Sequence, residues 1–205
     1  MKRSHLILLI FIGSALFFSL CFLPLQNADN LYDSVIRIHV LANSDSPEDQ
    51  ALKLLVRDEI LAFSRKSLSL GKNREEAKKE LEEHLDGIEA VARLALQSKG
   101  CSHGVRVTIG DEYYPTREYD TLSLPAGTYL SLRVQIGKAQ GKNWWCVLFP
   151  PLCLSSSIEA EDALAGAGME QENISTVMEK NKNMRVRFKF LEVLGKTKKA
   201  IRELF

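Results

Sequence analysis

The residues best suited to chemistry lie together near position 40, in the run Asn43-Ser44-Asp45-Ser46 that follows His39. A hydrolase built here would use His39 as base, Ser44 as nucleophile and Asp45 as the group that orients the base. His39 lies five residues upstream on a predicted strand, where each residue adds roughly 3.3 Å, so the base is placed beyond reach of the nucleophile. Asn43 and Asp45 are equally typical of a turn closed by short polar side chains. We therefore predict a non-enzymatic protein without catalytic residues, and keep a His39/Ser44/Asp45 hydrolase as the alternative.

The other histidines, at positions 5, 84 and 103, are dispersed along the chain. The sequence contains no Cys-x-x-Cys or His-x-x-x-His pair, no phosphate-binding glycine loop and no Gly-x-Ser-x-Gly turn. Lys and Arg total 27 against 26 Asp and Glu, so the net charge of +1 provides no global field for nucleic acid. We expect no cofactor, no metal ion, no nucleic-acid partner and no small-molecule substrate.

The most unusual stretch runs from Asn143 to Cys153 and contains the only two tryptophans, Trp144 and Trp145. On a strand, adjacent side chains point to opposite faces, so one ring can enter the core while the other is exposed. An exposed tryptophan is a favoured interface anchor. The alternative is that both rings are buried, one on each side of a central strand.

The N-terminus is typical of an export signal. Lys2 and Arg3 precede residues 6–25, which carry no charge, and about 20 apolar residues approach the length of a membrane span. Residues 1–28 are therefore either a cleaved secretory signal or an uncleaved N-terminal membrane anchor. Both alternatives place residues 29–205, as one extracytoplasmic domain, on the far side of the membrane.

That location permits disulfides. Cys146 and Cys153 lie seven residues apart and flank Pro150-Pro151, which can turn the chain and bring the two thiols together. The alternative is that both cysteines are small buried hydrophobic residues.

Hydrophobic spacing predicts the elements that must position these residues. Residues 35–41 alternate as a half-buried strand with one wet face. A helix then begins at Ser46 and Pro47, with Asp49 in the capping-box position, and a second helix runs from about residue 74 to Gly100. Alternation predicts further strands over 105–109 and 128–136 and a late strand over 184–193, and the strongly apolar run 144–149 predicts another. The three strands between residues 105 and 149 suit an antiparallel meander. The fold class is α+β: an antiparallel sheet packed by two helices from the N-terminal half, preceded by the signal or membrane segment.

The last residues are basic. Lys196, Lys198, Lys199 and Arg202 either contact anionic lipid headgroups at a membrane surface or form a solvated C-terminus.

Several blocks of the chain resemble the stage II sporulation protein R family, in the same order. They are Ile36–Ser46 with Asp49-Gln50 and Leu52-Lys53, then Tyr129–Ile136, Asn143–Cys153 and Val186–Glu192.

The resemblance implies a function that residue patterns alone do not reach. Proteins of this family are exported from the forespore into the intermembrane space of the sporulation septum. There they trigger a membrane-embedded aspartic-type protease that processes the precursor of sigma-E, a sigma factor. On this view the protease is the partner, and we expect Asn43, Asp45, Trp144 and Trp145 to contact it. A structural septal protein remains a further alternative.

Overall fold

Four strands form one mixed sheet in the order β2-β5-β1-β6. β1 (Ile36–Leu41) runs parallel to β5 (Gly127–Ile136) on one side and antiparallel to β6 (Asn143–Phe149) on the other. β2 (Val105–Tyr114) pairs antiparallel with the outer side of β5. The α+β class is confirmed, but the antiparallel meander is wrong, because β1 lies between β5 and β6 and makes the sheet mixed. All six residues of β1 are buried, and a strand of that kind is most stable at the centre of a sheet, with both edges paired.

The computed structural model describes residues 31–69, 73–119, 122–153 and 157–178, together with His5 and Ile12. Among these residues, no helix combines the length and the apolar character needed to cross a membrane. The proposed signal or anchor over 1–28, the predicted strand over 184–193 and the basic tail lie outside the described residues.

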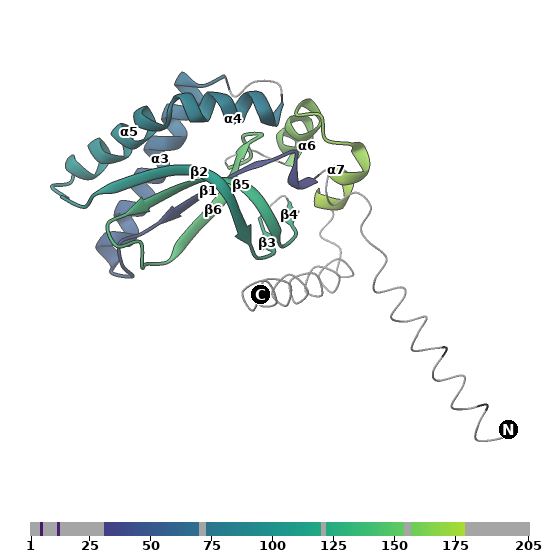
Figure 1. Ribbon diagram of the computed structural model, residues 1–205, viewed down its shortest axis with the longest axis horizontal. Helices are drawn as coiled ribbons and strands as arrows, with labels where there is room; N and C mark the ends of the chain where they lie inside the picture. The colour runs from purple at the N-terminus through teal and green to yellow at the C-terminus, as the bar shows by residue number, and fades with distance from the viewer. Residues whose placement is uncertain are drawn as a thin grey trace, which may run out of the picture.

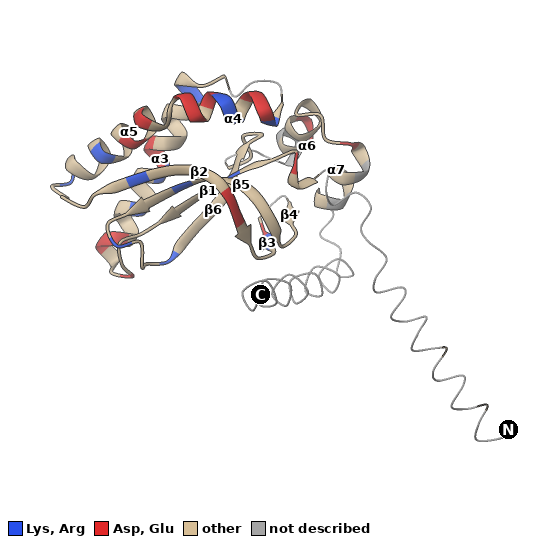
Figure 2. Ribbon diagram, viewed as in Figure 1, with Lys and Arg blue, Asp and Glu red and all other residues tan. Residues whose placement is uncertain are grey.

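Three helices cover one face of the sheet: α3 (Pro47–Ser67), α4 (Arg74–Glu83) and α5 (Leu85–Gln97) (Figure 1). The prediction of two helices is wrong, because the second one breaks at His84 into α4 and α5. At the break, the ring nitrogen Nδ1 of His84 lies 2.8 Å from the carbonyl oxygen of Glu80. A break of one residue hardly disturbs the hydrophobic spacing, so the periodicity did not reveal it. Basic and acidic residues alternate along α4 (Figure 2), where Lys78 lies near Glu82 and Lys79 lies near Glu83.

The main core lies between these helices and the sheet. Ile36, Ile38 and Val40 point into it from β1. The buried residues that meet them from the helices are Val56, Ile60, Leu81, Ile88, Ala92 and Leu96.

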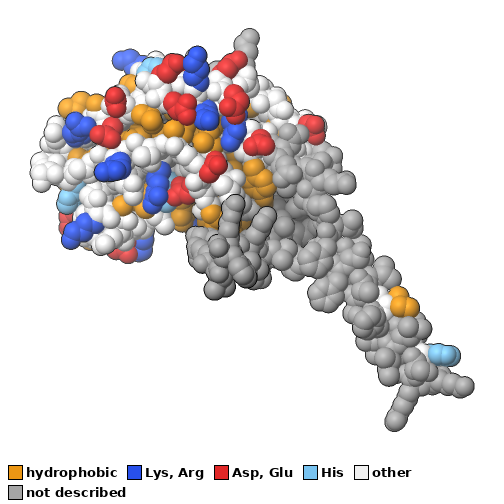
Figure 3. Space-filling model, viewed as in Figure 1, with side chains coloured by type: hydrophobic (Ala, Val, Ile, Leu, Met, Phe, Trp, Pro, Cys, Tyr) orange, Lys and Arg blue, Asp and Glu red, His pale blue; other side chains and the backbone are white. Residues whose placement is uncertain are grey.

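A second apolar cluster covers part of the opposite face. It includes residues of the short hairpin β3 (Arg117–Glu118) and β4 (Ser123–Leu124), of α6 (Ser157–Gly166) and of α7 (Gln171–Met178). The expected wet face of β1 is therefore wrong: Arg37 is 0% exposed and His39 is 5% exposed. On the surface shown in Figure 3, acidic and basic side chains are interspersed among apolar ones.

Candidate functional site

The two tryptophans of β6 lie on opposite faces of the sheet, as predicted. Trp144 packs against the main core beneath the helices, and Trp145 packs against the second cluster. Each ring is half-buried and has an arginine over it: the guanidinium carbon of Arg57 lies 5.2 Å from the Trp144 ring centroid, and that of Arg117 lies 3.7 Å from the Trp145 centroid. The sequence left two alternatives open: one ring in the core and one exposed, or both rings buried. Neither holds fully, because both rings are half-buried.

Trp145 belongs to an aromatic layer that sequence reasoning missed. Its ring centroid lies 5.2 Å from that of His39 and 6.3 Å from that of Tyr114. The Arg37 guanidinium carbon lies 3.9 Å from the Tyr114 centroid and 5.0 Å from the Tyr129 centroid. These contacts join residues from β1, β2, β5 and β6, so spacing along the chain could not reveal them.

Arg37 is the most unusual member of this layer, because it is a fully buried cation. It donates a hydrogen bond from Nη2 to the Tyr119 hydroxyl, while its Nε and Nη1 atoms have no hydrogen-bond partner. No carboxylate of the described residues lies within ion-pair distance of it. Burial raises the pKa of both Tyr114 and Tyr129, so these tyrosines stay neutral. The ring faces of Tyr114 and Tyr129 and the hydroxyl of Tyr119 are therefore the groups that stabilise the buried charge of Arg37.

His39 is held by two side chains from other strands. Its Nδ1 lies 2.9 Å from Glu112 Oε1 and its Nε2 lies 3.0 Å from Asn143 Oδ1. Burial alone would raise the pKa of Glu112, but hydrogen bonds from His39 and Ser131 outweigh that effect and lower it. Both ring nitrogens of His39 are engaged, so the histidine is not paired with Ser44 as a triad would require.

Ser44 and Asn43 instead bind Asp49. Asp49 Oδ2 accepts hydrogen bonds from the Ser44 hydroxyl and, at 2.8 Å, from Asn43 Nδ2. The other carboxylate oxygen, Oδ1, lies 3.3 Å from Nε2 of His103. Half of the predicted capping box is present, since the Asp49 amide donates to the Ser46 hydroxyl at 3.2 Å, while the Ser46 amide bonds Ser44 Oγ at 3.2 Å. The Asp49 carboxylate thus joins the turn after β1 to α3 and to the loop that carries His103.

Asn43 and Asp45, both predicted to bind a partner, make contacts inside the fold. Asn43 Oδ1 accepts a hydrogen bond from the Lys138 amide at 3.0 Å, and Asp45 Oδ1 accepts one from the Lys142 amide at 2.6 Å. Asn43 and Asp45 therefore hold the β5–β6 loop against the turn after β1. This agrees with the alternative that these two residues shape a turn. Their contact with a partner stays a prediction.

We expect Asp49→Asn to lower the free energy of unfolding at pH 7 by about 1.5–3 kcal/mol, the usual range for hydrogen bonds to a charged group. Hydrogen bonds from Ser44 and then Asn43 lower the pKa of Asp49. A lowered pKa stabilises the fold above the unfolded value, and that stabilisation is lost as the pH falls through the folded value. The difference in the free energy of unfolding between wild type and variant should therefore become smaller below about pH 4.

Urea unfolding at pH 7 and at acidic pH measures this gap. Asp58→Asn is the matched control, because Asp58 is exposed and forms a surface pair with Arg57 at 2.7 Å. The control should change the free energy by less than about 1 kcal/mol. A gap for Asp49→Asn that stays constant with pH would contradict the prediction.

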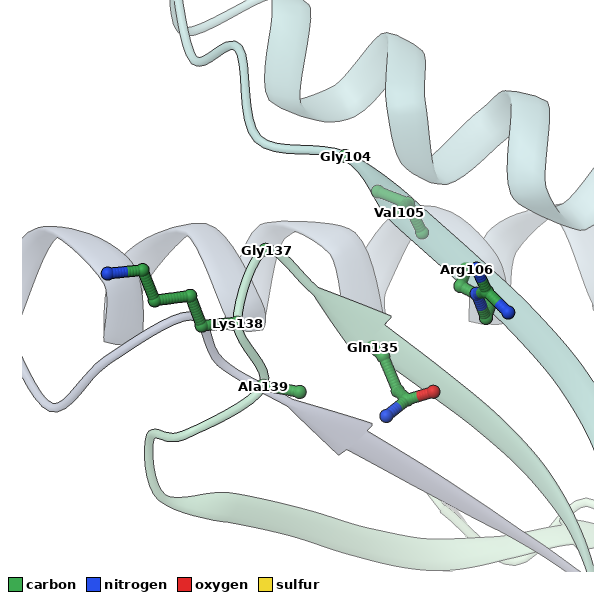
Figure 4. Close-up of a pocket in the computed structure, with 7 residues that line it drawn as sticks. All are labelled: Gly104, Val105, Arg106, Gln135, Gly137, Lys138 and Ala139. Atoms are coloured by element: carbon green, nitrogen blue, oxygen red, sulfur yellow. The ribbon is translucent and has the colours of Figure 1, made fainter.

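An open pocket lies at the end of the sheet where β5 meets β2 (Figure 4). Figure 4 shows Arg106 and Gln135 side by side on adjacent strands, whereas the Lys138 side chain points away. The loop amides cannot cradle an anion there: the Gly137 amide donates to the Gly104 carbonyl at 2.8 Å, and the Lys138 amide donates to Asn43. We assign no ligand to this pocket. Within the described ranges, no group of three or more His, Cys, Asp or Glu side chains is placed to hold a metal ion.

The structure pairs Cys146 with Cys153, whose Cα atoms lie 5.6 Å apart, within the range for disulfides. Cys101 is left free. The disulfide in the exported protein stays a prediction, which thiol alkylation before and after reduction would test.

These contacts define an α+β domain with a mixed sheet. Its buried polar side chains, such as His39 and Asp49, form hydrogen bonds with other side chains of the domain. The chain belongs to the stage II sporulation protein R family, a family of sporulation proteins: residues 32–159 match the family model described as Stage II sporulation protein R. It is 38% identical over 125 residues to the Stage II sporulation protein R of Bacillus subtilis (strain 168). That alignment covers 59% of this chain and 54% of the relative, so the chain spans about half the length of the curated relative. No solved structure matches the chain.

Proposed function

We propose that this chain is an exported signalling protein that activates a membrane-embedded aspartic-type protease, which then processes the sigma-E precursor during endospore formation. Family membership supports a role in sporulation. The observation that carries the proposal is the pair Trp144 and Trp145 on an edge strand, each half-buried and stacked with an arginine. Tryptophan and arginine are the residues that most often dominate binding at protein interfaces.

Export is part of the proposal. Residues 1–28 would serve as a cleaved signal or as an anchor, and the domain would act in the intermembrane space of the sporulation septum. A permitted disulfide between Cys146 and Cys153 is consistent with that compartment.

The hydrolase alternative has less support, because Ser44 bonds Asp49 and His39 bonds Glu112 and Asn143. We expect Ser44→Ala to keep its signalling activity wherever the variant folds. Loss of activity in a folded Ser44→Ala protein would favour the hydrolase instead. A structural septal protein would differ from both, since its activity would scale with abundance and tolerate loss of single surface side chains.

The test is processing of the sigma factor precursor in a host that co-expresses the protease, with and without the exported full chain. Precursor should be cleaved only when the chain is present. We expect Trp144→Ala to reduce cleavage by about tenfold or more, the effect of losing an interface anchor worth 1.4 kcal/mol or more. Thr108→Ala, at an exposed site on the opposite edge strand, is the matched control and should cleave like wild type. Intact precursor despite verified export and folding would overturn direct activation.

A further inference from the structure

The loop between β5 and β6, residues 137–142, has a fully bonded main chain. β5 and β6 pair with opposite edges of β1, so the loop must cross the turn that follows β1. Every amide of the loop donates a hydrogen bond, and most of the acceptors lie in that turn. From Gly137 to Lys142 the acceptors are the Gly104 carbonyl, Asn43 Oδ1, the carbonyls of Ile136, Asn43 and Ala42, and Asp45 Oδ1. The path of the loop is therefore fixed by the fold.

Two further features show how strongly this path is imposed. Ala139 has a φ of 53°, in the left-handed region that residues other than glycine seldom adopt. Such conformations persist only where surrounding contacts impose them, and they concentrate at functional sites. The carbonyl of Lys142 also accepts a hydrogen bond at 2.9 Å from the buried Lys53. A strained residue and a buried cation thus both serve to hold a surface loop.

The side chains of the same loop have no comparable role inside the fold. Lys138, Gln140 and Lys142 are exposed, and none of these side chains forms a hydrogen bond or an ion pair with the part of the chain that the structure describes. In Figure 4 the Lys138 side chain points away from the pocket. The loop therefore presents two ammonium groups and one amide, which supply hydrogen-bond donors, on a fixed main chain. A loop already fixed in its bound conformation loses less entropy on binding.

A protein surface fits this loop better than a lipid surface. Anionic lipids are typically recognised by clusters of about four to eight Lys and Arg residues. This loop carries only Lys138 and Lys142, and the exposed Asp45 and Glu48 beside it have the opposite sign. The half-buried Trp144 follows the loop closely in sequence, and tryptophan is a favoured anchor at protein interfaces. Hydrogen-bond donors beside a tryptophan suit a protein partner that offers carboxylate or carbonyl acceptors.

We propose that residues 137–142, together with Trp144, form the recognition loop through which this chain contacts the protease. Lys138, Gln140 and Lys142 would donate hydrogen bonds to carboxylate or carbonyl groups on its extracytoplasmic surface. The inference rests on the proposed function for the identity of the partner. The recognition role itself is argued from the bonded main chain, the strain at Ala139 and the exposed donor side chains.

Photo-crosslinking of the full chain in the co-expression host tests where the contact lies. A photoreactive amino acid replaces Gln140, which leaves both lysines in place. The matched control replaces Lys66, an exposed residue in the last turn of α3, at the opposite end of that helix from the turn that holds the loop. We expect the crosslink to the protease to be at least about tenfold stronger from position 140 than from position 66. No crosslink from 140, an equal one from 66, or a crosslink from 140 mainly to lipid or to a second copy of the chain overturns the inference.

Precursor processing is scored in the same cells, which separates this inference from the proposed function. Processing that depends on the chain, without a crosslink from position 140, counts against the recognition loop alone. A crosslink from 140 without any processing counts against activation of the protease and leaves the contact in place.

A double substitution tests the chemistry of the contact. Lys138→Glu combined with Lys142→Glu replaces two donors by acceptors and should lower the crosslink from position 140 by about tenfold. Urea unfolding should stay close to that of wild type, because neither lysine side chain bonds within the described fold. The matched control, Arg65→Glu with Lys66→Glu, makes the same change of charge in the last turn of α3 and should leave the crosslink unchanged. A folded Lys138→Glu/Lys142→Glu protein that crosslinks like wild type overturns the role of the lysines.

Discussion

Replacing Gly141 with alanine is expected to lower the free energy of unfolding by about 3 kcal/mol, at the upper end of the usual range for overpacking. A Cβ atom built on Gly141 would lie 2.1 Å from the carbonyl oxygen of Ser44 and 2.5 Å from its carbonyl carbon. Because those atoms are main chain, no rotamer change relieves the contact. The Gly141 amide also donates to the Ala42 carbonyl at 2.9 Å, so the β5–β6 loop would have to leave the turn after β1.

Gly110→Ala is the matched control for this substitution. Gly110 is exposed on β2, and a Cβ there meets nothing within 4 Å. Its replacement should be neutral or should stabilise the fold by about 0.5–1 kcal/mol, because glycine loses more backbone freedom in a strand than alanine does. Urea unfolding of the two variants measures the difference. Equal effects would show that the loop can move away from Ser44 with little loss of stability.

Replacing Arg37 with alanine should also have a large effect. We expect it to lower the free energy of unfolding by about 3–5 kcal/mol, the range for truncating a large buried side chain. The fully buried Arg37 lies among the rings of Tyr114, Tyr119 and Tyr129, so truncation leaves a cavity between layers that cannot collapse freely. The same change removes the hydrogen bond to the Tyr119 hydroxyl.

Arg37→Met separates volume from charge, because methionine fills much of the same space without a cation. Replacing a buried charge with an apolar side chain of similar volume is often close to neutral, so we expect this variant to lose less than about 2 kcal/mol. If Arg37→Met proves as unstable as Arg37→Ala, the guanidinium stacking on the tyrosines stabilises the fold more than the packing does. Denaturant unfolding followed by tyrosine and tryptophan fluorescence measures both variants.

Local features of the fold could be predicted because their causes lie within a few residues. Ser46 caps α3 and Pro47 follows in its first turn, as the spacing indicated, since a cap needs only the next turn of helix. The strands at 36–41 and 127–136 and the first half of β2, residues 105–109, were predicted from alternation, and the strand at 143–149 was predicted from its apolar run. β2 continues five residues beyond its predicted end, to Tyr114. The opposite orientation of Trp144 and Trp145 follows from strand geometry alone.

The polar cluster around Asp49 could be predicted only in part. Asn43, Ser44 and Asp49 are close in sequence, so their importance was visible, but a turn and a catalytic site use the same residue types. His103 reaches Asp49 from the loop after α5, and Glu112 reaches His39 from β2. No sequence spacing relates these pairs, because chain segments far apart in sequence meet there.

Residue order was sufficient to establish the α+β class, the bounds of β1, β5 and β6 to within one residue, and the family to which the chain belongs. The assembled fold alone decided that β1 lies between β5 and β6 and that Arg37 and His39 are buried. The physical reason is the range of the interactions. Caps, turns and periodicity act within one or two turns of chain, whereas strand order and burial depend on which distant surfaces together remove the most apolar area from water.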